Sequence, residues 1–360
     1  DLDSGVPLDR MPPLGYVLGG LWAALFGLTE ISMRWFGIVA VAAAAPALFM
    51  AGRRAAGPLG GLFCLTFLLL SPNLISQSVA IRAYPLFFTF CAWGTWCFAL
   101  LVIDREPERP RGPGDRETWW ALLALALFVL AASYTHFYGL VFGAFVFGSV
   151  IVDRWSRRAS TGPAFGIGVA TALLGLGVVP FALAAADLSS SGAATEAQAP
   201  GLLESLRDAI RLAVRTVAHA SHFVHPVGAS VLGTGVFGLA AMVLAARRAD
   251  TPLRQRLVTA APLLAAFPTL IVLSLIITSF GVLEPHYNIW MQPITALWLS
   301  QALRADGPLR RRLAVGAALL AVLGQALGAG VFLREMRYFT NGPGEWVAAR
   351  SEERRVGKEC

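Results

Sequence analysis

Long apolar stretches follow one another along nearly the whole chain, and short polar segments separate them. A helix needs about 20 apolar residues, with a range of about 17–25, to cross the hydrocarbon core of a bilayer. The pattern therefore predicts an all-α, polytopic membrane protein. Ten spanning helices are predicted near residues 31–51, 57–72, 84–103, 118–134, 137–152, 163–186, 228–246, 258–279, 289–303 and 313–333.

Two further helices are predicted outside the membrane core. Residues 12–28, PPLGYVLGGLWAALFGL, are apolar but precede a span without a polar turn, so they are expected to lie in the outer interface with Tyr16 and Trp22 at headgroup depth. In the loop 187–227, a small polar linker leads into LLESLRDAIRLAVRTVAHASHF, whose apolar residues recur at helical spacing. Its arginines, spaced every four residues, face either lipid phosphates or, as a lid, a phosphate-bearing substrate. They are Arg207, Arg211 and Arg215.

Composition supports the membrane assignment. Hydrophobic residues make up 56% of the 360 residues and charged residues 14%, with a mean hydropathy of +0.63. Soluble domains have roughly 45–50% apolar and about 25% charged residues. The four cysteines form no CxxC pair and predict neither a disulfide framework nor a metal site.

The net charge of +7 comes from arginines whose positions argue against nucleic-acid binding. Of the 29 basic residues, 17 lie in short loops after the first, third, fifth, seventh and ninth spans, as expected of cytoplasmic loops. Alternation of the spans then places the remaining loops on the opposite, outer side, namely residues 1–30, 73–83, 135–136, 187–227, 280–288 and 334 onward. The arginines are Arg53, Arg54, Arg105, Arg109, Arg111, Arg116, Arg154, Arg157, Arg158, Arg247, Arg248, Arg254, Arg256, Arg304, Arg310, Arg311 and Arg312.

The ends of the chain suggest the domain scheme. Because residue 1 is Asp and a membrane chain usually starts inside, we expect one more span upstream, which gives eleven in total. Residues 1–333 are assigned to the membrane domain and 334–350 to the start of an extracytoplasmic segment. The last ten residues, SEERRVGKEC, hold the one lysine of the chain and resemble vector sequence, so 351–360 are excluded from functional reasoning.

Ionisable groups at membrane depth are costly and mark candidate sites. Arg82, in QSVAIRAYPLFF, stands at the outer end of the third span beside Tyr84. Its guanidinium suits bidentate binding of phosphate oxygens, and Tyr84 and Ser78 can add neutral hydrogen bonds. The alternative is that Arg82 extends to lipid headgroups without a specific role.

Two more outer turns carry candidate residues. SYTHFYGL places His136 and Tyr138 between the fourth and fifth spans, and GVLEPHYNIWMQP places Glu284, His286 and Tyr287 before the ninth. Histidines can donate to a phosphate or move a proton, and the carboxylate can orient a hydroxyl. The alternatives are a turn histidine satisfied by backbone and an ordinary polar turn.

Other chemistry finds less support. His219, His222 and His225 in HASHFVH make a metal site conceivable, but Pro226 and the nearby loop favour an exposed helix end. No cofactor is indicated, nor is a divalent metal. The chain has no P-loop, GxGxxG, HExxH or nucleophile elbow. A lipid-linked substrate is therefore favoured over a soluble nucleotide donor.

Four segments, in order along the chain, resemble the polyprenyl-phosphate-sugar-dependent glycosyltransferases of the GT-C fold, which include protein O-mannosyltransferase-like and aminoarabinose-transferase-like enzymes. MPPLGYVLGGLWAALFGLTEISMRWFGIVA is similar to their PPL block, QSVAIRAYPL to a "ys.eaRpYaL" segment, SYTHFYGL to an "ltHyygl" turn and EPHYNIWMQP to an "RY…P" segment. The resemblance covers roughly residues 5–350. Departures are Met11 for a histidine, Val79–Ala80 for an acid and His286 for an arginine.

The resemblance implies an inverting transfer of a sugar from a polyprenyl phosphate to a lipid, glycan or protein acceptor, on the outer face of a bacterial inner membrane. It implies that Arg82, Tyr84, His136, His286 and Tyr287 bind the donor phosphate. Glu284 and Tyr138 then orient the acceptor. A carboxylate acts as base, either Asp3 or Asp9 or an acid upstream of the sequence.

Two alternatives come from other classes. A transporter or flippase of a lipid-linked substrate favours charges at mid-membrane, whereas the ionisable groups here gather at outer ends of spans. A non-catalytic scaffold leaves the arginine–histidine clustering unexplained.

Overall fold

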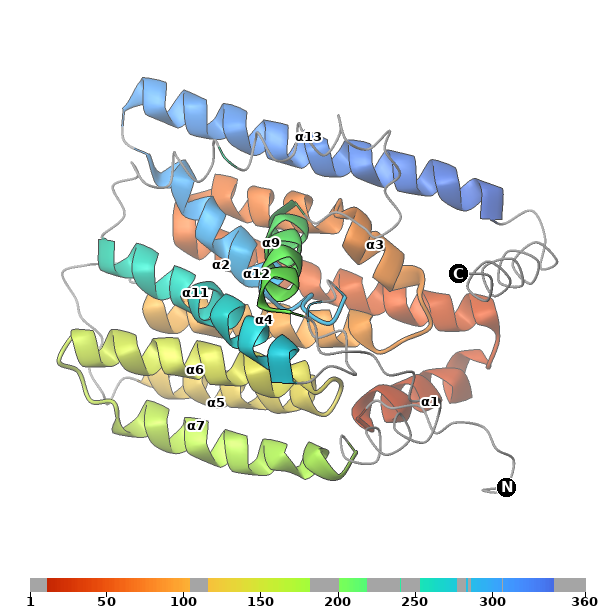
Figure 1. Cartoon of the computed structure of the whole chain (residues 1–360), viewed down its shortest axis with the longest axis horizontal. Coiled ribbons are helices and arrows are strands. Elements are labelled where there is room, and N and C mark those ends of the chain that lie inside the picture. Colours follow the sequence, from red (N-terminus) through yellow and green to blue (C-terminus); the bar gives the residue numbers. More distant parts are fainter. Residues whose placement is uncertain are drawn as a thin grey trace.

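The computed structural model describes residues 12–103, 116–181, 201–218, 240, 253–276, 283, 286–305 and 307–339, and these form helices and turns without a strand. The predicted all-α class is confirmed for this part of the chain (Figure 1). The helices are α1 (Leu14–Phe26), α2 (Glu30–Leu69), α3 (Pro72–Val79), α4 (Tyr84–Val102), α5 (Arg116–Ser133), α6 (Tyr138–Ser156), α7 (Gly162–Gly175) with the 3-10 turn η1 (Leu176–Val178), α9 (Leu202–Ala218), α11 (Leu253–Ile276), α12 (Met291–Ser300) with η2 (Gln301–Arg304), and α13 (Pro308–Phe339).

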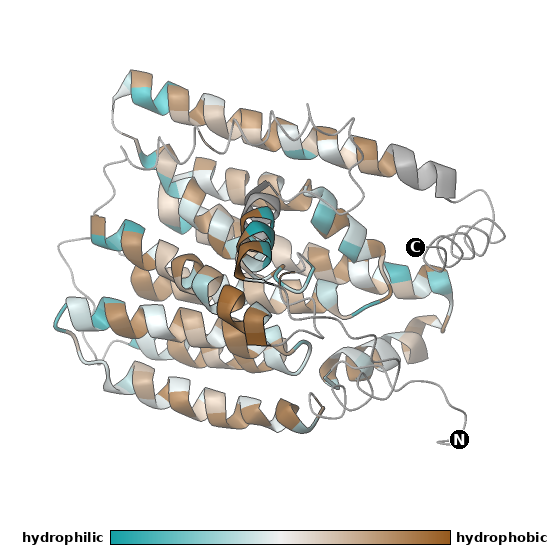
Figure 2. Ribbon diagram, in the orientation of Figure 1, coloured by the Kyte–Doolittle hydropathy of each residue, from teal (hydrophilic) through white to brown (hydrophobic). Residues whose placement is uncertain are grey.

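The surface of the bundle is apolar, as a bilayer requires. Seven of the described helices are long and apolar enough to cross a membrane, namely α2, α4, α5, α6, α7 with its extension to Phe181, α11 and α13. Large side chains such as Leu127, Leu173 and Leu319 are more than 60% exposed, which is unfavourable in water but not in lipid. Hydrophilic residues gather at one end of α6, α11 and α13, on the left in Figure 2. The chain is a polytopic membrane protein.

α2 is a hairpin rather than a straight rod. A continuous helix of 40 residues would be about 60 Å long, twice the hydrocarbon thickness. Ala56 and Gly57 leave helical geometry, and Gly57 has φ +70°. A Cβ on Gly52 would lie 2.2 Å from the carbonyl oxygen of Gly60, so the two arms pack backbone against backbone. The reversal falls between the predicted spans 31–51 and 57–72.

α4 and α12 form the centre. Phe87, Phe88 and Phe98 of α4 are fully buried, and α4 packs against α2 and α5. The span predicted at 289–303 is a ten-residue helix, α12, enclosed by α2, α11 and α4. At about 15 Å, α12 reaches only half the hydrocarbon thickness. Its apolar sequence reflects burial on all sides inside the bundle rather than contact with lipid.

The predicted interfacial helices exist as helices. α1 matches the expectation for 12–28, and α9 confirms the helix predicted after the polar linker. α9 stands across the direction of the long helices (Figure 1), and contacts α11 and α12. α13 continues as helix to Phe339, past the predicted end at 333, because no Gly or Pro intervenes. The predicted span 228–246 lies outside the described residues except for residue 240.

The arginine-rich segments meet at one end of the bundle. Arg54 donates to the carbonyl oxygen of Ile103 at 2.9 Å and Arg157 to that of Val102 at 3.0 Å, so both satisfy the C-terminus of α4. Buried Asp153 pairs with Arg157 at 2.8 Å and also with Arg254 of α11. We call this the arginine end. The opposite end, where α4 and α6 begin, holds the candidate site.

Candidate functional site

Five of the predicted site residues lie ring against ring at this opposite end. They come from the start of α4, the turn between α5 and α6, and the segment before α12. The ring centroids of Tyr84 and His136 are 5.4 Å apart, those of Tyr84 and His286 5.2 Å, and those of His136 and Tyr287 5.6 Å. Phe87 stacks on His136 and joins these five residues in what we call the aromatic cluster: Tyr84, Phe87, His136, Tyr138, His286 and Tyr287.

The turn that carries His136 is fixed by backbone contacts. The N–H of His136 donates to the carbonyl oxygen of Ala132 at 2.8 Å, and the N–H of Gly139 donates to that of His136 at 2.8 Å. Gly139 packs so closely that a Cβ there would lie 2.2 Å from the backbone nitrogen of Ser133. Only glycine lets α6 start directly against the end of α5, and this places the imidazole beneath Tyr84.

His136 is held between aromatic rings with one nitrogen occupied. Its ring stacks on Phe87 at 4.9 Å, and its Nδ1 accepts the N–H of Tyr138 at 3.3 Å. Its Nε2 is buried and has no hydrogen-bond partner among the described residues. The alternative of a turn histidine satisfied by backbone therefore accounts for one nitrogen and not the other.

Burial controls the charge of His136. The side chain is 2% exposed, and this burial, together with the nearby His286, lowers the pKa of His136 from 6.5 to about 3. The ring is thus neutral at pH 7. The Tyr84 hydroxyl is likewise buried and makes no hydrogen bond of regular geometry in the described part of the chain, although the Arg82 and Tyr287 side chains lie close to it. Two buried polar groups at this end therefore lack a regular hydrogen bond among the described residues.

Arg82 differs from the other arginines described near this end. Arg34 pairs with Glu30 at 2.5 Å within α2, whereas Arg82 is exposed and has no carboxylate partner among the described residues. Its charge acts on the Tyr84 hydroxyl, so it lies beside the aromatic cluster. An exposed guanidinium next to buried, unpartnered polar groups suits the binding of an anion.

Two of the three predicted α9 arginines are paired with acids on the same helix. Arg207 pairs with Glu204 at 3.3 Å and Arg211 with Asp208 at 3.2 Å, each within one helical turn. The helix buries Ala209 against its neighbours. The Arg215 side chain lies outside the described residues.

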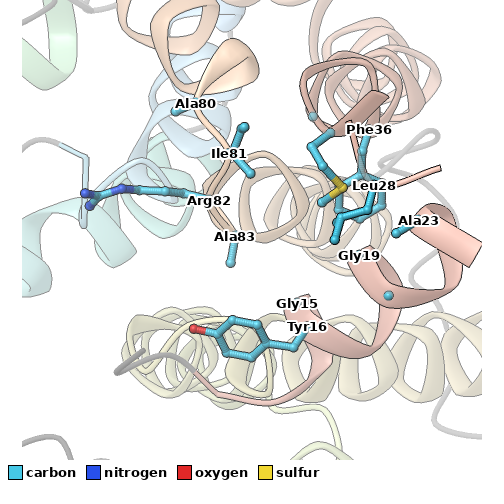
Figure 3. A pocket seen from close by; sticks show the side chains of 13 residues that line it. Gly15, Tyr16, Gly19, Ala23, Leu28, Phe36, Ala80, Ile81, Arg82 and Ala83 are labelled. Carbon is cyan, nitrogen blue, oxygen red and sulfur yellow. The ribbon is translucent and has the colours of Figure 1, made fainter. Parts of the chain in front are cut away.

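A cavity of about 360 Å³ is lined in part by the Arg82 segment. α1 contributes glycines (Gly15, Gly19 and Gly20), α2 contributes Met33 and Phe36, and residues 80–83 close the cavity. In Figure 3 the guanidinium of Arg82 extends away from Phe36 and Leu28, so the segment has an apolar side and a charged side. This cavity was not predicted from the sequence, although the glycines at positions 15 and 19 share a face of α1 and were a usable signal.

Several predicted residues cannot be placed. Asp3, Asp9, Glu284 and the histidines of HASHFVH lie outside the described residues. Among the described residues, no group of three or more His, Cys, Asp or Glu side chains is arranged to hold a metal ion. Phe87 belongs to the aromatic cluster but was not predicted, because an apolar residue inside an apolar span carries no signal.

Comparison with known proteins supports the fold. No protein-family model and no curated protein matches the chain in sequence. It is similar to ArnT from Cupriavidus metallidurans bound to undecaprenyl phosphate, with a TM-score of 0.53 and 14% identity over 90% of this chain. It is also similar to the archaeal oligosaccharyltransferase AglB from Archaeoglobus fulgidus in complex with an inhibitory peptide and a dolichol-phosphate, with a TM-score of 0.51 and 11% identity over 89%.

The chain spans 66% of the length of the ArnT structure and 47% of the AglB structure. At such low identity the likeness concerns the arrangement of the helices alone. The chain has a GT-C-like fold.

Proposed function

We propose that the protein is a membrane glycosyltransferase that moves a sugar from a polyprenyl-phosphate donor to an acceptor on the extracytoplasmic face. The observation that carries the proposal is the aromatic cluster beside Arg82. Arg82, a cation without a carboxylate partner in the described residues, adjoins Tyr84, and the Tyr84 hydroxyl and His136 Nε2 are buried without a regular hydrogen bond among these residues. The oxygens of a phosphate group are acceptors for all three groups.

The cavity that residues 80–83 help to line adds support. An amphiphile with an anionic head and an apolar chain matches a cavity that has Leu28, Met33 and Phe36 in its wall and Arg82 at its edge. The solved structures of similar fold carry undecaprenyl phosphate or a dolichol-phosphate. We therefore assign donor-phosphate binding to Arg82, Tyr84, His136, His286 and Tyr287.

In the proposed reaction an acceptor hydroxyl loses its proton to a carboxylate, and its oxygen attacks the anomeric carbon. The bond from that carbon to the phosphate oxygen breaks with inversion, and the lipid phosphate leaves with the electron pair. Arg82 and His136 stabilise the charge that develops on the leaving group, an effect that is strongest in a water-poor site. We assign the base to Asp3, to Asp9 or to an acid upstream, and acceptor orientation to Glu284 and Tyr138.

The proposed setting is the bacterial inner membrane, with the aromatic cluster facing outward and the arginine end in the cytoplasm. The proposed partners are the lipid donor, the bilayer and an acceptor lipid, glycan or protein. The opposite sidedness of the two ends rests on the positive-inside rule.

The test is binding and turnover by Arg82→Ala in proteoliposomes. We expect this variant to lose undecaprenyl-phosphate binding by at least about tenfold, since a hydrogen bond to a charged group contributes about 1.5–3 kcal/mol. Arg34→Ala is the matched control, because Arg34 is already paired with Glu30, and it should bind as the wild type does. Normal sugar transfer by Arg82→Ala would refute the assignment. Passage of radiolabelled donor across the bilayer without sugar release would favour the transporter alternative.

A further inference from the structure

Within the proposed function, on which this inference rests, we propose that His136 binds the lipid phosphate as a neutral imidazole of fixed tautomer. The backbone N–H of Tyr138 holds Nδ1 as an acceptor, and Nε2–H is the donor to a phosphate oxygen. His136 then positions the phosphate by a directed hydrogen bond, whereas Arg82 supplies the positive charge.

The tautomer follows from the hydrogen bond of Tyr138. A neutral imidazole carries one N–H and one acceptor nitrogen. Nδ1 faces the backbone N–H of Tyr138 at 3.3 Å, so it must be the unprotonated nitrogen and the proton must lie on Nε2. Nε2 has no partner among the described residues and is buried. Nε2–H is therefore a buried hydrogen-bond donor without an acceptor among the described residues.

The ring cannot easily turn to exchange its nitrogens. Phe87 stacks on it from α4 at 4.9 Å, and Tyr84 and Tyr287 lie at 5.4 and 5.6 Å. These contacts come from two separate parts of the fold, the start of α4 and the segment before α12, and they hold the turn between α5 and α6 that carries His136. The direction of Nε2–H is therefore set before any ligand arrives, which lowers the entropic cost of binding.

The surroundings keep the ring uncharged. Among the described residues, the titratable groups near it are Tyr84 at the start of α4, Tyr138 on α6, and His286 and Tyr287 before α12, with Arg82 acting on Tyr84. Burial, aided by His286, lowers the pKa of His136 to about 3. An anion close by raises a pKa by about one to three. A bound phosphate therefore leaves His136 neutral at pH 7, and a proton-shuttle role at that pH is disfavoured.

Two substitutions of His136 test which of its ring nitrogens binds the phosphate. The amide of Gln at position 136 places its nitrogen near the position of Nε2, whereas the amide of Asn places it near that of Nδ1. The probe is the methyl phosphodiester of undecaprenol, whose single charge does not change with pH, and undecaprenol is the uncharged control. In detergent micelles of the full chain, His136→Gln should bind the diester within about threefold of the wild type, and His136→Asn should lose about tenfold or more.

A second measurement reports the ring directly. Selective ¹⁵N labelling of the five histidines distinguishes protonated from unprotonated ring nitrogens. We expect one histidine with unprotonated Nδ1 and protonated Nε2, unchanged between about pH 5.5 and 8 and missing from the spectrum of His136→Gln. Thermal unfolding of both variants establishes that they are folded.

The outcomes are distinct. The inference is wrong, and the proposed function stands, if the wild type prefers the diester to undecaprenol but one of two results is seen. The first is an equal loss of binding in folded His136→Gln and His136→Asn, and the second is a His136 signal that titrates near pH 6.5. If the wild type binds the diester no better than undecaprenol, the proposed function itself fails, and so does the assignment of a phosphate ligand to His136.

Discussion

Removing the Tyr84 hydroxyl should stabilise the protein and weaken ligand binding at the same time. Tyr84 is 1% exposed, and its hydroxyl makes no hydrogen bond of regular geometry in the described structure, although Arg82 and Tyr287 lie close to it. A group kept in this state is unfavourable for folding and persists where a ligand needs it. The substitution Tyr84→Phe removes one oxygen and keeps the ring contacts with His136 at 5.4 Å and His286 at 5.2 Å.

The magnitude follows from the environment of the hydroxyl. Leaving a buried polar group unsatisfied costs about 1–3 kcal/mol. Because the charge of Arg82 acts on this hydroxyl and offsets part of the cost, we expect the lower limit, a gain of about 1 kcal/mol in the free energy of unfolding. The lost hydrogen bond to an anionic oxygen should weaken phosphodiester binding by about tenfold.

Tyr134→Phe is the matched control. The hydroxyl of Tyr134 donates to the carbonyl oxygen of Leu174 at 3.0 Å, so its removal should cost about 0.5–1.5 kcal/mol. The two variants therefore shift stability in opposite directions, by about 2 kcal/mol relative to each other. Denaturant titration in mixed micelles, followed by tryptophan fluorescence, measures both. If Tyr84→Phe is destabilised as much as Tyr134→Phe, the hydroxyl of Tyr84 is satisfied within the protein and the reasoning fails.

Three further perturbations test the rest of the structure. Burial and His286 lower the pKa of His136 to about 3, so below pH 6.5 the unfolded chain takes up a proton that the folded chain does not. The free energy of unfolding should therefore fall by up to about 1.4 kcal/mol per pH unit from pH 6.5 downward. A pH titration of the stability of His136→Gln should lack this component. Gly139→Ala should disrupt the turn and reduce both stability and diester binding, since its Cβ meets backbone at 2.2 Å, whereas Gly148→Ala has open space and should be neutral in the same assays. Asp153→Asn breaks a buried ion pair and should lower the free energy of unfolding by about 3 kcal/mol. We expect this lower limit of the usual range because the Arg254 side chain is 32% exposed. Diester binding should not change, and a change would mean that the two ends of the bundle are coupled.

The sequence predicted the helices well where a local property decides them. Apolar length set the span at 84–103, which the structure places at Tyr84–Val102, and helical spacing predicted α9. The arginine positions predicted which loops share an end, and Arg54, Arg157 and Arg254 do lie together. Each of these inferences depends on residues close together in the sequence, or on charge counted loop by loop.

Other features depended on neighbours that are distant in sequence. The stretch 289–303 is apolar enough to suggest a span, but only its enclosure by α2, α4 and α11 makes it a short internal helix.

For the candidate site, the sequence by itself determined which polar residues stand at the outer ends of the spans, because a charge or a histidine beside an apolar run is visible without a fold. The tertiary structure alone decided that Tyr84, His136 and Tyr287 meet ring to ring, that Phe87 joins them, and that the imidazole is neutral. The physical reason is that desolvation and directed hydrogen bonds depend on how the helices pack, and packing brings together residues some 50 to 200 positions apart.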